Sequence, residues 1–277
     1  MPFRITTLVD NTVSAGKGLI GEHGLSFLIE SGGRKILFDT GQGFALPHNA
    51  GILGIKLSEV DTVVLSHGHY DHTGGLKSLL SCNSTFSLIA HPGVFVQRFS
   101  KREGRTHEIG IPMMQRDFEK KGVRMVLDQK PQPLAPGITT TGEIPIECGY
   151  EFADDSLFIL NDRRMVQDPL EDDQALFLET SRGIVILFGC AHRGPINTLK
   201  HVVKMTGTRE IHAVIGGLHL MKASKERIEK VVESFSKFKV KKIMVGHCTG
   251  FDATVALYRE FQGMVSPNSV GSVMEIP

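Results

Sequence analysis

The stretch VVLSHGHYDHTGGL, Val63–Leu76, places three histidines and an aspartate within six residues, directly after an apolar run. On an extended segment His67 and His69 point the same way, because side chains two positions apart share a face. Asp71 and His72 follow on the turn beyond. Imidazoles and carboxylates suit zinc, manganese or iron, and two such ligand groups about 3.5–4 Å apart form a binuclear centre. The stretch therefore predicts metal ligands where a buried strand ends.

Three later stretches share one design, in which an apolar run ends in glycine and a histidine follows. They are VILFGCAH with His192, AVIGGLH with His219 and IMVGHC with His247. Strand ends at one edge of a sheet converge, so we expect these histidines to meet the opening motif in space. Cys248 would point away from His247 on an extended segment, and we therefore leave it out of the ligand set.

The rest of the chain alternates short β-branched runs with helical patterns. FLIESGGRKILF carries Gly-Gly between two apolar runs, which predicts a hairpin. Helices are predicted in GPINTLKHVVKM with Pro195 near its start, in ASKERIEKVVESFSKF with Ser224 as N-cap, and in FDATVALYREF with Asp252 as N-cap. Several apolar runs are continuous, as in strands buried on both faces. This order fits a sandwich of two sheets with helices outside.

We expect one domain over residues 1–277, of class α/β, built as a four-layer helix–sheet–sheet–helix sandwich. Residues from about 100 to 170 differ in composition from the rest of the chain, because they are richer in proline, glycine and charge. QKPQPLAPG is the clearest turn cluster there. We interpret this middle segment as a less regular insertion or cap between two sheet-forming halves.

Composition narrows the classes of partner and location. The chain of 277 residues has a formal net charge of +1, which gives no electrostatic footprint for nucleic acid or an anionic membrane. No apolar stretch approaches the about 18 residues that a membrane span needs, and the N-terminus lacks a signal-peptide pattern. The four cysteines are scattered, which favours a reducing cytoplasm. We expect a small-molecule substrate, and a homo-oligomer remains open.

On these motifs the chain resembles the metallo-β-lactamase superfamily, whose H-x-H-x-D-H signature matches His67, His69, Asp71 and His72. The resemblance implies a four-layer α/β sandwich that holds divalent metal, with two ions expected. Zinc is the first expectation, and manganese, magnesium and iron are alternatives. LFDTG resembles an early strand motif of the family, in which Asp39 would orient the site. VGHC resembles its closing motif, which makes His247 the last ligand.

The sequence departs from the family pattern in two places. The usual ligand histidine before a strand of the second half has no match, and LEDDQALFLE offers Asp172 and Asp173 there instead. The usual bridging aspartate aligns with Cys190 in FGCAH, with His192 two residues on. We expect His192 to be a ligand and keep Cys190 as a further candidate.

Within the superfamily the motif set is similar to that of the archaeal methanopterin-pathway enzyme. That enzyme joins a dihydropterin-methyl diphosphate to ribofuranosylaminobenzene 5′-phosphate. We expect a transferase of this kind, with a metal-dependent hydrolase of a small ester, lactone or phosphoester as the alternative. A non-catalytic metal or redox protein is the second alternative. Asp71 and His219 are the candidate catalytic residues, and His23 and Arg193 are candidates to contact substrate or orient the site.

Overall fold

Two β-sheets pack face to face in the computed structural model, which describes residues 2–14, 18–151 and 154–277. The first sheet has the order β19 (Val273–Ile276), β1 (Phe3–Val9), β2 (Ser26–Ser31), β3 (Arg34–Phe38), β4 (Thr62–Val64), β5 (Ser87–Ala90), β8 (Arg124–Leu127). The second has the order β18 (Val265–Pro267), β17 (Ile243–Val245), β15 (Glu210–Gly216), β14 (Gly183–Phe188), β13 (Leu176–Thr180), β10 (Ile138–Thr140), β9 (Pro133–Ala135), with β16 (Lys239–Val240) beside β15.

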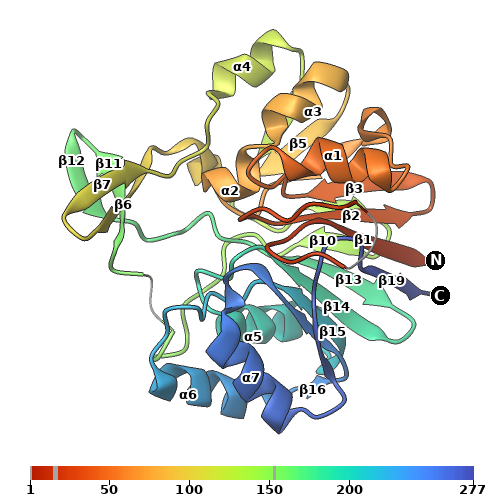
Figure 1. Cartoon of the computed structure of the whole chain (residues 1–277), viewed down its shortest axis with the longest axis vertical. Helices are drawn as coiled ribbons and strands as arrows, with labels where there is room; N and C mark the ends of the chain where they lie inside the picture. Colours follow the sequence, from red (N-terminus) through yellow and green to blue (C-terminus); the bar gives the residue numbers. More distant parts are fainter. Residues whose placement is uncertain (1, 15–17, 152–153) are drawn as a thin grey trace.

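Helices cover the outer face of each sheet (Figure 1). On the first sheet they are α1 (Ala45–Ile52), α2 (Tyr70–Thr73), α3 (Leu76–Cys82) and α4 (Gln115–Lys120). On the second they are α5 (Pro195–Thr206), α6 (Lys225–Phe235) and α7 (Phe251–Glu260). The described residues also form three short 3-10 turns: η1 (Leu57–Glu59), η2 (Pro92–Phe95) and η3 (His247–Thr249). This arrangement confirms the predicted four-layer α/β sandwich. No described helix has both the length and the apolar content to cross a membrane.

Three apolar layers hold the sandwich together, one between the sheets and one under each helical layer. The continuous apolar run of strand β2 contributes side chains to two of these layers. Phe27 and Ile29 face the other sheet, whereas Leu28 faces the helices. All three are fully buried, and each such side chain contributes about 1.5–3 kcal/mol. Continuous apolar runs are therefore needed wherever a strand is covered on both faces.

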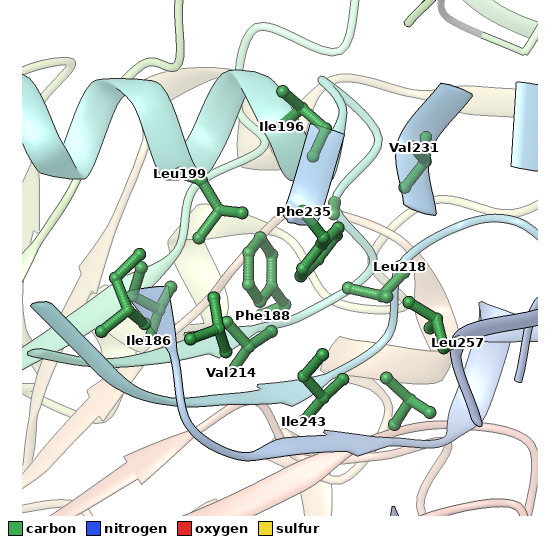
Figure 2. Close-up of a cluster of buried hydrophobic side chains, with 14 of the residues drawn as sticks. Ile186, Phe188, Ile196, Leu199, Val214, Leu218, Val231, Phe235, Ile243 and Leu257 are labelled. Atoms are coloured by element: carbon green, nitrogen blue, oxygen red, sulfur yellow. The ribbon is translucent and has the colours of Figure 1, made fainter. Parts of the chain in front are cut away.

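The layer under α5, α6 and α7 fastens the second sheet to its helices (Figure 2). Phe188 on β14 and Val214 on β15 pack there with Leu199, Phe235 and other apolar side chains of the three helices. Ser224 caps α6 as predicted, because its side chain accepts the backbone N–H of Arg227. The N-cap expected at Asp252 is wrong. Gly250 occupies the N-cap position of α7, and Asp252 lies within the first turn.

The strands that lead to the endings with glycine and histidine run in one direction. β14, β15 and β17 pair in parallel, as do β3, β4 and β5. Their carboxyl ends therefore gather at one edge of the sandwich. Four non-glycine residues within three positions of these strand ends have positive φ: Asp39 at 59°, Ala191 at 55°, His219 at 49° and His247 at 48°. Such unfavourable backbone clusters where side chains must be aimed at a functional site.

The segment interpreted as a cap contributes to all three sheets of the molecule. It supplies β8 to the first sheet and β9 and β10 to the second. Two hairpins form a separate sheet that projects to the left in Figure 1. Its order is β12 (Arg164–Gln167), β11 (Leu157–Asn161), β6 (Arg98–Arg102), β7 (Arg105–Glu108). We propose that this hairpin sheet, rather than the whole segment, acts as the cap.

Candidate metal centre

Two groups of ligand atoms lie side by side at the edge where the strands end. The first, called here the three-histidine set, comprises His67, His69 and His192. Nε2 of His67 lies 2.9 Å from Nδ1 of His69 and 3.2 Å from Nε2 of His192. All three side chains are buried. Three imidazole nitrogens with an open fourth position form a common catalytic zinc site.

The second group, the mixed set, comprises Asp71, His72, Cys190 and His247. Nε2 of His72 lies 3.1 Å from Nε2 of His247, and Sγ of Cys190 lies 3.2 Å and 3.1 Å from these two nitrogens. Oδ2 of Asp71 lies 3.6 Å and 3.5 Å from the same pair. A tetrahedral zinc ion with bonds of about 2.0–2.3 Å separates its ligand atoms by about 3.3–3.8 Å. The mixed set has nearly this spacing.

Hydrogen bonds on the far side of the mixed set turn the Nε2 atoms of His72 and His247 toward one another. Nδ1 of His72 lies 2.7 Å from Oδ2 of Asp39, and Nδ1 of His247 lies 3.1 Å from Oδ1 of Asn11. Because both oxygens only accept, each Nδ1 carries a hydrogen, and Nε2 of a neutral ring is then a lone pair. Two such nitrogens 3.1 Å apart repel unless a proton or a metal ion lies between them. The residues therefore fit a divalent cation.

Asp39 reaches the three-histidine set through Ser66. The Ser66 hydroxyl donates to Oδ2 of Asp39 at 2.6 Å, so it accepts from Nδ1 of His67 at 2.8 Å. Nε2 of His67 is then also a lone pair, directed at His69 and His192. One buried carboxylate thus sets the tautomer of a histidine in each set. Close packing supports this contact, since a Cβ on Gly189 would lie 2.1 Å from the Ser66 hydroxyl oxygen.

Burial is the largest influence on the titration of the cluster. It lowers the pKa of four imidazoles well below the ordinary 6.5, with nearby positive groups adding to the effect: His67, His69, His192, His247. Burial also opposes protonation of His72, but the carboxylates of Asp71 and Asp39 prevail and raise its pKa to about 9. The mixed set therefore favours a positive charge, whether a proton or a metal ion carries it.

Cys190 lies between the two sets. Its sulfur is within 4.8 Å of ligand atoms of His67 and His72, and also of His192 and His219. Burial raises the pKa of its thiol well above the ordinary value, so the proton would leave only when a cation replaces it. This position suits a ligand shared by two ions. Cys190 aligns with the bridging aspartate of the family pattern, and the sequence did not decide which residue takes that role here.

The exclusion of Cys248 assumed an extended segment, and that assumption is wrong. Residues His247–Thr249 form the turn η3, and φ of His247 is positive. The Cys248 sulfur consequently lies within 4.8 Å of ligand atoms of Cys190 and His247, and it accepts the backbone N–H of His219 at 3.3 Å. Burial would raise the pKa of this thiol, but contacts with Cys190 and His219 lower it to about 5.

Asp172 and Asp173, offered in place of the missing family histidine, belong to neither set. Asp172 accepts the backbone N–H of Gly68 at 2.8 Å and pairs with the Arg98 guanidinium at 2.7 Å. Arg98 also donates to Asp168 at 2.8 Å, and all three charged groups are buried. This triad joins the loop between His67 and His69 to the base of the hairpin sheet. Asp173 accepts the backbone N–H of Arg193 at 2.8 Å.

The remaining predicted site residues differ in their placement. Nε2 of His23 lies 3.3 Å from Oδ2 of Asp71, with half of the His23 side chain exposed. The His219 ring lies 4.1 Å from that of His192, and its Nε2 lies 3.9 Å from Oδ2 of Asp154. The expected substrate contact by Arg193 is not supported, because its guanidinium donates to the carbonyls of Ile144 and Pro169.

A cavity of about 1300 Å³ opens above both sets. Ligand residues line its floor, and the β6–β7 hairpin and the segment around Asp154 line other parts. Two cationic side chains also line the cavity, Lys222 from the loop before α6 and Arg227 from its first turn. Sequence reasoning missed Asp154 and Arg227, since neither follows an apolar strand or belongs to a motif. Asn11 and Ser66 were missed too, although Ser66 stands beside the first ligand.

Comparison with known proteins places this geometry in a family. The metallo-β-lactamase superfamily model matches residues 19–81. A curated relative from Methanocaldococcus jannaschii is 38% identical over 94% of this chain and 92% of its own length. The chain belongs to the metallo-β-lactamase superfamily. The relative is named 7,8-dihydropterin-6-methyl-4-(β-D-ribofuranosyl)-aminobenzene-5′-phosphate synthase. This similarity confirms the prediction of an enzyme of this superfamily that resembles that synthase.

Two further superfamily relatives cover nearly the whole chain. An uncharacterised protein of the same organism is 35% identical over 91% of this chain and 93% of its own length. The crystal structure of Tm1679, described as a metal-dependent hydrolase of the β-lactamase superfamily, superposes with a TM-score of 0.85. It is 30% identical and covers 99% of both chains. The shared fold therefore extends over the hairpin sheet as well as the sandwich.

Proposed function

We propose that this enzyme joins a dihydropterin-methyl diphosphate to 4-(β-D-ribofuranosyl)aminobenzene 5′-phosphate and releases diphosphate. The observation that carries the proposal is 38% identity to the named synthase over 94% of the chain, a span that includes both ligand sets. In this reaction the amine nitrogen bonds to the pterin methylene carbon as the carbon–oxygen bond to diphosphate breaks. The amine proton goes to a base, and the electron pair leaves with diphosphate.

We further propose two divalent cations, with zinc in both sets. Imidazole and thiol ligands favour zinc over magnesium, which prefers oxygen. His67, His69 and His192 would hold one ion, and Asp71, His72, Cys190 and His247 the other, with Cys190 shared. Bound cations supply Lewis acidity that stabilises negative charge on a leaving oxygen.

His219 is the residue of this chain best placed to donate a hydrogen bond or a proton to the leaving group. Burial opposes its protonation, but contacts with Asp154 and Cys248 raise its pKa to about 9. It is therefore charged near neutral pH. Its Nδ1 is buried without a partner among the described residues, and the side chain lines the cavity. Asp71, held by His23, is our candidate to accept or orient the amine proton.

The cavity supports a reaction of two substrates. Its volume of about 1300 Å³ exceeds the roughly 300–1000 Å³ of ordinary ligand pockets. The hairpin sheet contributes Arg102, Arg105 and Glu108 to its wall, so it can shield the reacting carbon from water. Exclusion of water is what separates transfer to an amine from hydrolysis.

Purified, zinc-loaded enzyme incubated with both substrates should release diphosphate together with the coupled product, detected by mass spectrometry. Neither substrate alone should release diphosphate. A variant carrying His67→Ala and His69→Ala serves as the control without a complete three-histidine set. Diphosphate release from the pterin substrate alone would contradict the proposal and indicate a hydrolase.

Hydrolysis of a small ester, lactone or phosphoester is the second candidate. It is favoured by the similarity to Tm1679, the metal-dependent hydrolase with 30% identity and a TM-score of 0.85. Hydrolysis would need a water molecule where the proposed reaction needs the amine. A panel of such substrates, assayed on the same zinc-loaded preparation, separates the two functions by the presence or absence of turnover without an amine. The non-catalytic alternative has no observation in its favour.

A further inference from the structure

One guanidinium in the cavity wall has donors that find no acceptor in the parts of the chain that the structure describes. Arg227 lies in the first turn of α6, and its Nε and Nη2 are buried without a hydrogen-bond partner among the described residues. Burial lowers the pKa of Arg227, and the carboxylates of Glu151 and Asp154 only partly oppose this. Unsatisfied buried donors are costly, and arginine remains charged in proteins. A positive group kept in this state suits an anionic ligand.

The surroundings of Arg227 leave it available to a ligand. Asp154 is engaged elsewhere, at 3.9 Å from both His219 and Arg102. Glu151 accepts the backbone N–H groups of Ile196 and Asn197 at the start of α5. Lys222 lines the same cavity, is exposed, and forms no ion pair within the described ranges. Arg227 and Lys222, both on the α6 side of the cavity, are therefore not committed to any partner within residues 2–14, 18–151 and 154–277.

We propose that Arg227, assisted by Lys222, binds the 5′-phosphate of the arylamine substrate. The inference rests on the proposed function and adds a recognition site to it. The diphosphate leaves next to the metal ligands, so the ribose phosphate needs a separate cationic partner. A guanidinium fork matches two oxygens of a phosphate monoester, which carries a charge of about −1.5 to −2 at neutral pH. Arg227 is thus a specificity-determining residue rather than a metal ligand.

The test compares binding of 4-(β-D-ribofuranosyl)aminobenzene 5′-phosphate with binding of its dephosphorylated form, by calorimetry on zinc-loaded protein without the pterin substrate. Arg227→Met should weaken binding of the phosphorylated form by about 10- to 100-fold, as expected for a lost charge-assisted hydrogen-bond pair. Binding of the dephosphorylated form should be unchanged. Arg227→Lys keeps the charge without the fork, so it should lie between wild type and Arg227→Met.

Arg259→Met is the matched control, because Arg259 is exposed on α7 and does not line the cavity. It should bind both forms as wild type does. Zinc content and circular dichroism should be the same for all variants. If Arg227→Met keeps the wild-type preference for the phosphorylated form, the inference is overturned.

Binding and turnover separate this inference from the proposed function. An Arg227-dependent preference for the phosphorylated form supports the anchor even if no coupled product forms. Coupling in which Arg227→Met has the wild-type KM for the phosphorylated amine overturns the anchor and leaves the proposed function standing. Absence of any phosphate preference in the wild type also overturns the anchor.

Discussion

The three-histidine set and the mixed set share one edge of the sandwich but are supported very differently. In the mixed set the outer nitrogen of each histidine is held, His72 by Asp39 and His247 by Asn11. In the three-histidine set only His67 has such a contact, through Ser66. The outer nitrogens of His69 and His192 are buried without a partner among the described residues. The mixed set is therefore the more rigidly oriented of the two.

The two sets also differ in charge. The mixed set brings a carboxylate and a thiol that ionises on metal binding, whereas the three-histidine set consists of neutral imidazoles. An anionic, preoriented set binds a divalent cation more tightly than a neutral one. We therefore propose that the mixed set would fill first and that an ion in the three-histidine set would exchange more readily.

Replacing His67 and His69 together by alanine should have the largest effect. The three-histidine set would keep only His192, so metal content should fall from two ions per chain to one, while the chain stays folded. Elemental analysis measures the content, and circular dichroism checks the fold. His48→Ala is the control, because His48 is exposed and lies outside both sets. Two retained ions would remove both histidines from the ligand assignment.

Asp39→Asn should weaken both sets, because Asp39 contacts His72 directly and His67 through Ser66. Loss of such an orienting partner typically costs about 10- to 100-fold in metal affinity. Competition with a chromogenic chelator measures both affinities. Asp252→Asn on exposed α7 is the charge-matched control. A loss of zinc affinity in the mixed set alone would show that the contact between Asp39 and His67 through Ser66 does not affect the three-histidine set.

The pH dependence of zinc binding should differ between the sets. Metal must displace a proton from His72, whose pKa is about 9, so affinity of the mixed set should rise about tenfold per pH unit between pH 7 and 9. Release of the Cys190 proton would steepen this rise. The three-histidine set has pKa values well below 6.5, so its affinity should stay flat over the same range.

Each set can be titrated alone in a variant that lacks the other. His67→Ala with His69→Ala leaves the mixed set, and His72→Ala with His247→Ala leaves the three-histidine set. Isothermal titration in buffers of different ionisation enthalpy counts the protons released. Equal slopes for the two variants would contradict the difference in charge between the sets.

Ser66→Ala should have the smallest effect. It removes one hydrogen bond to His67, worth about 0.5–1.5 kcal/mol, and leaves the contact between Asp39 and His72 in place. Zinc affinity of the three-histidine set should fall by roughly 2- to 10-fold, and that of the mixed set should not change. The competition with a chromogenic chelator described for Asp39→Asn measures the two zinc affinities separately. A larger loss of zinc affinity in the mixed set than in the three-histidine set would contradict this prediction.

Local patterns predicted much of the fold. The Gly-Gly hairpin joins β2 and β3 with Gly32 at φ 57° and Gly33 at φ 80°, as a two-residue turn requires. Helix α6 begins at its predicted cap, Ser224. The hairpin sheet was beyond such reasoning, because β6 pairs with β11 across more than fifty residues and no local period records that pairing.

For the site, the sequence named the ligand candidates and, through the family resemblance, one orienting partner, Asp39, which contacts His72. It did not name Asn11 or Ser66. Arg193 was a candidate to contact substrate or orient the site, and its guanidinium donates to two carbonyl groups. Cys248 was expected to point away and lies at the cluster because η3 is a turn. In each case the residue type was informative, whereas its direction depended on backbone angles and neighbours far along the chain.

By itself the sequence determined the layered α/β architecture and the histidine-rich strand endings, since burial on two faces and ligand chemistry leave marks on consecutive residues. Only the tertiary structure decided how those histidines divide into two sets, and that Asp39 serves both. It alone showed that Arg227 faces the same cavity with donors that have no partner in the described parts of the chain. These features depend on distances between side chains that lie tens to hundreds of residues apart, which no short-range pattern encodes.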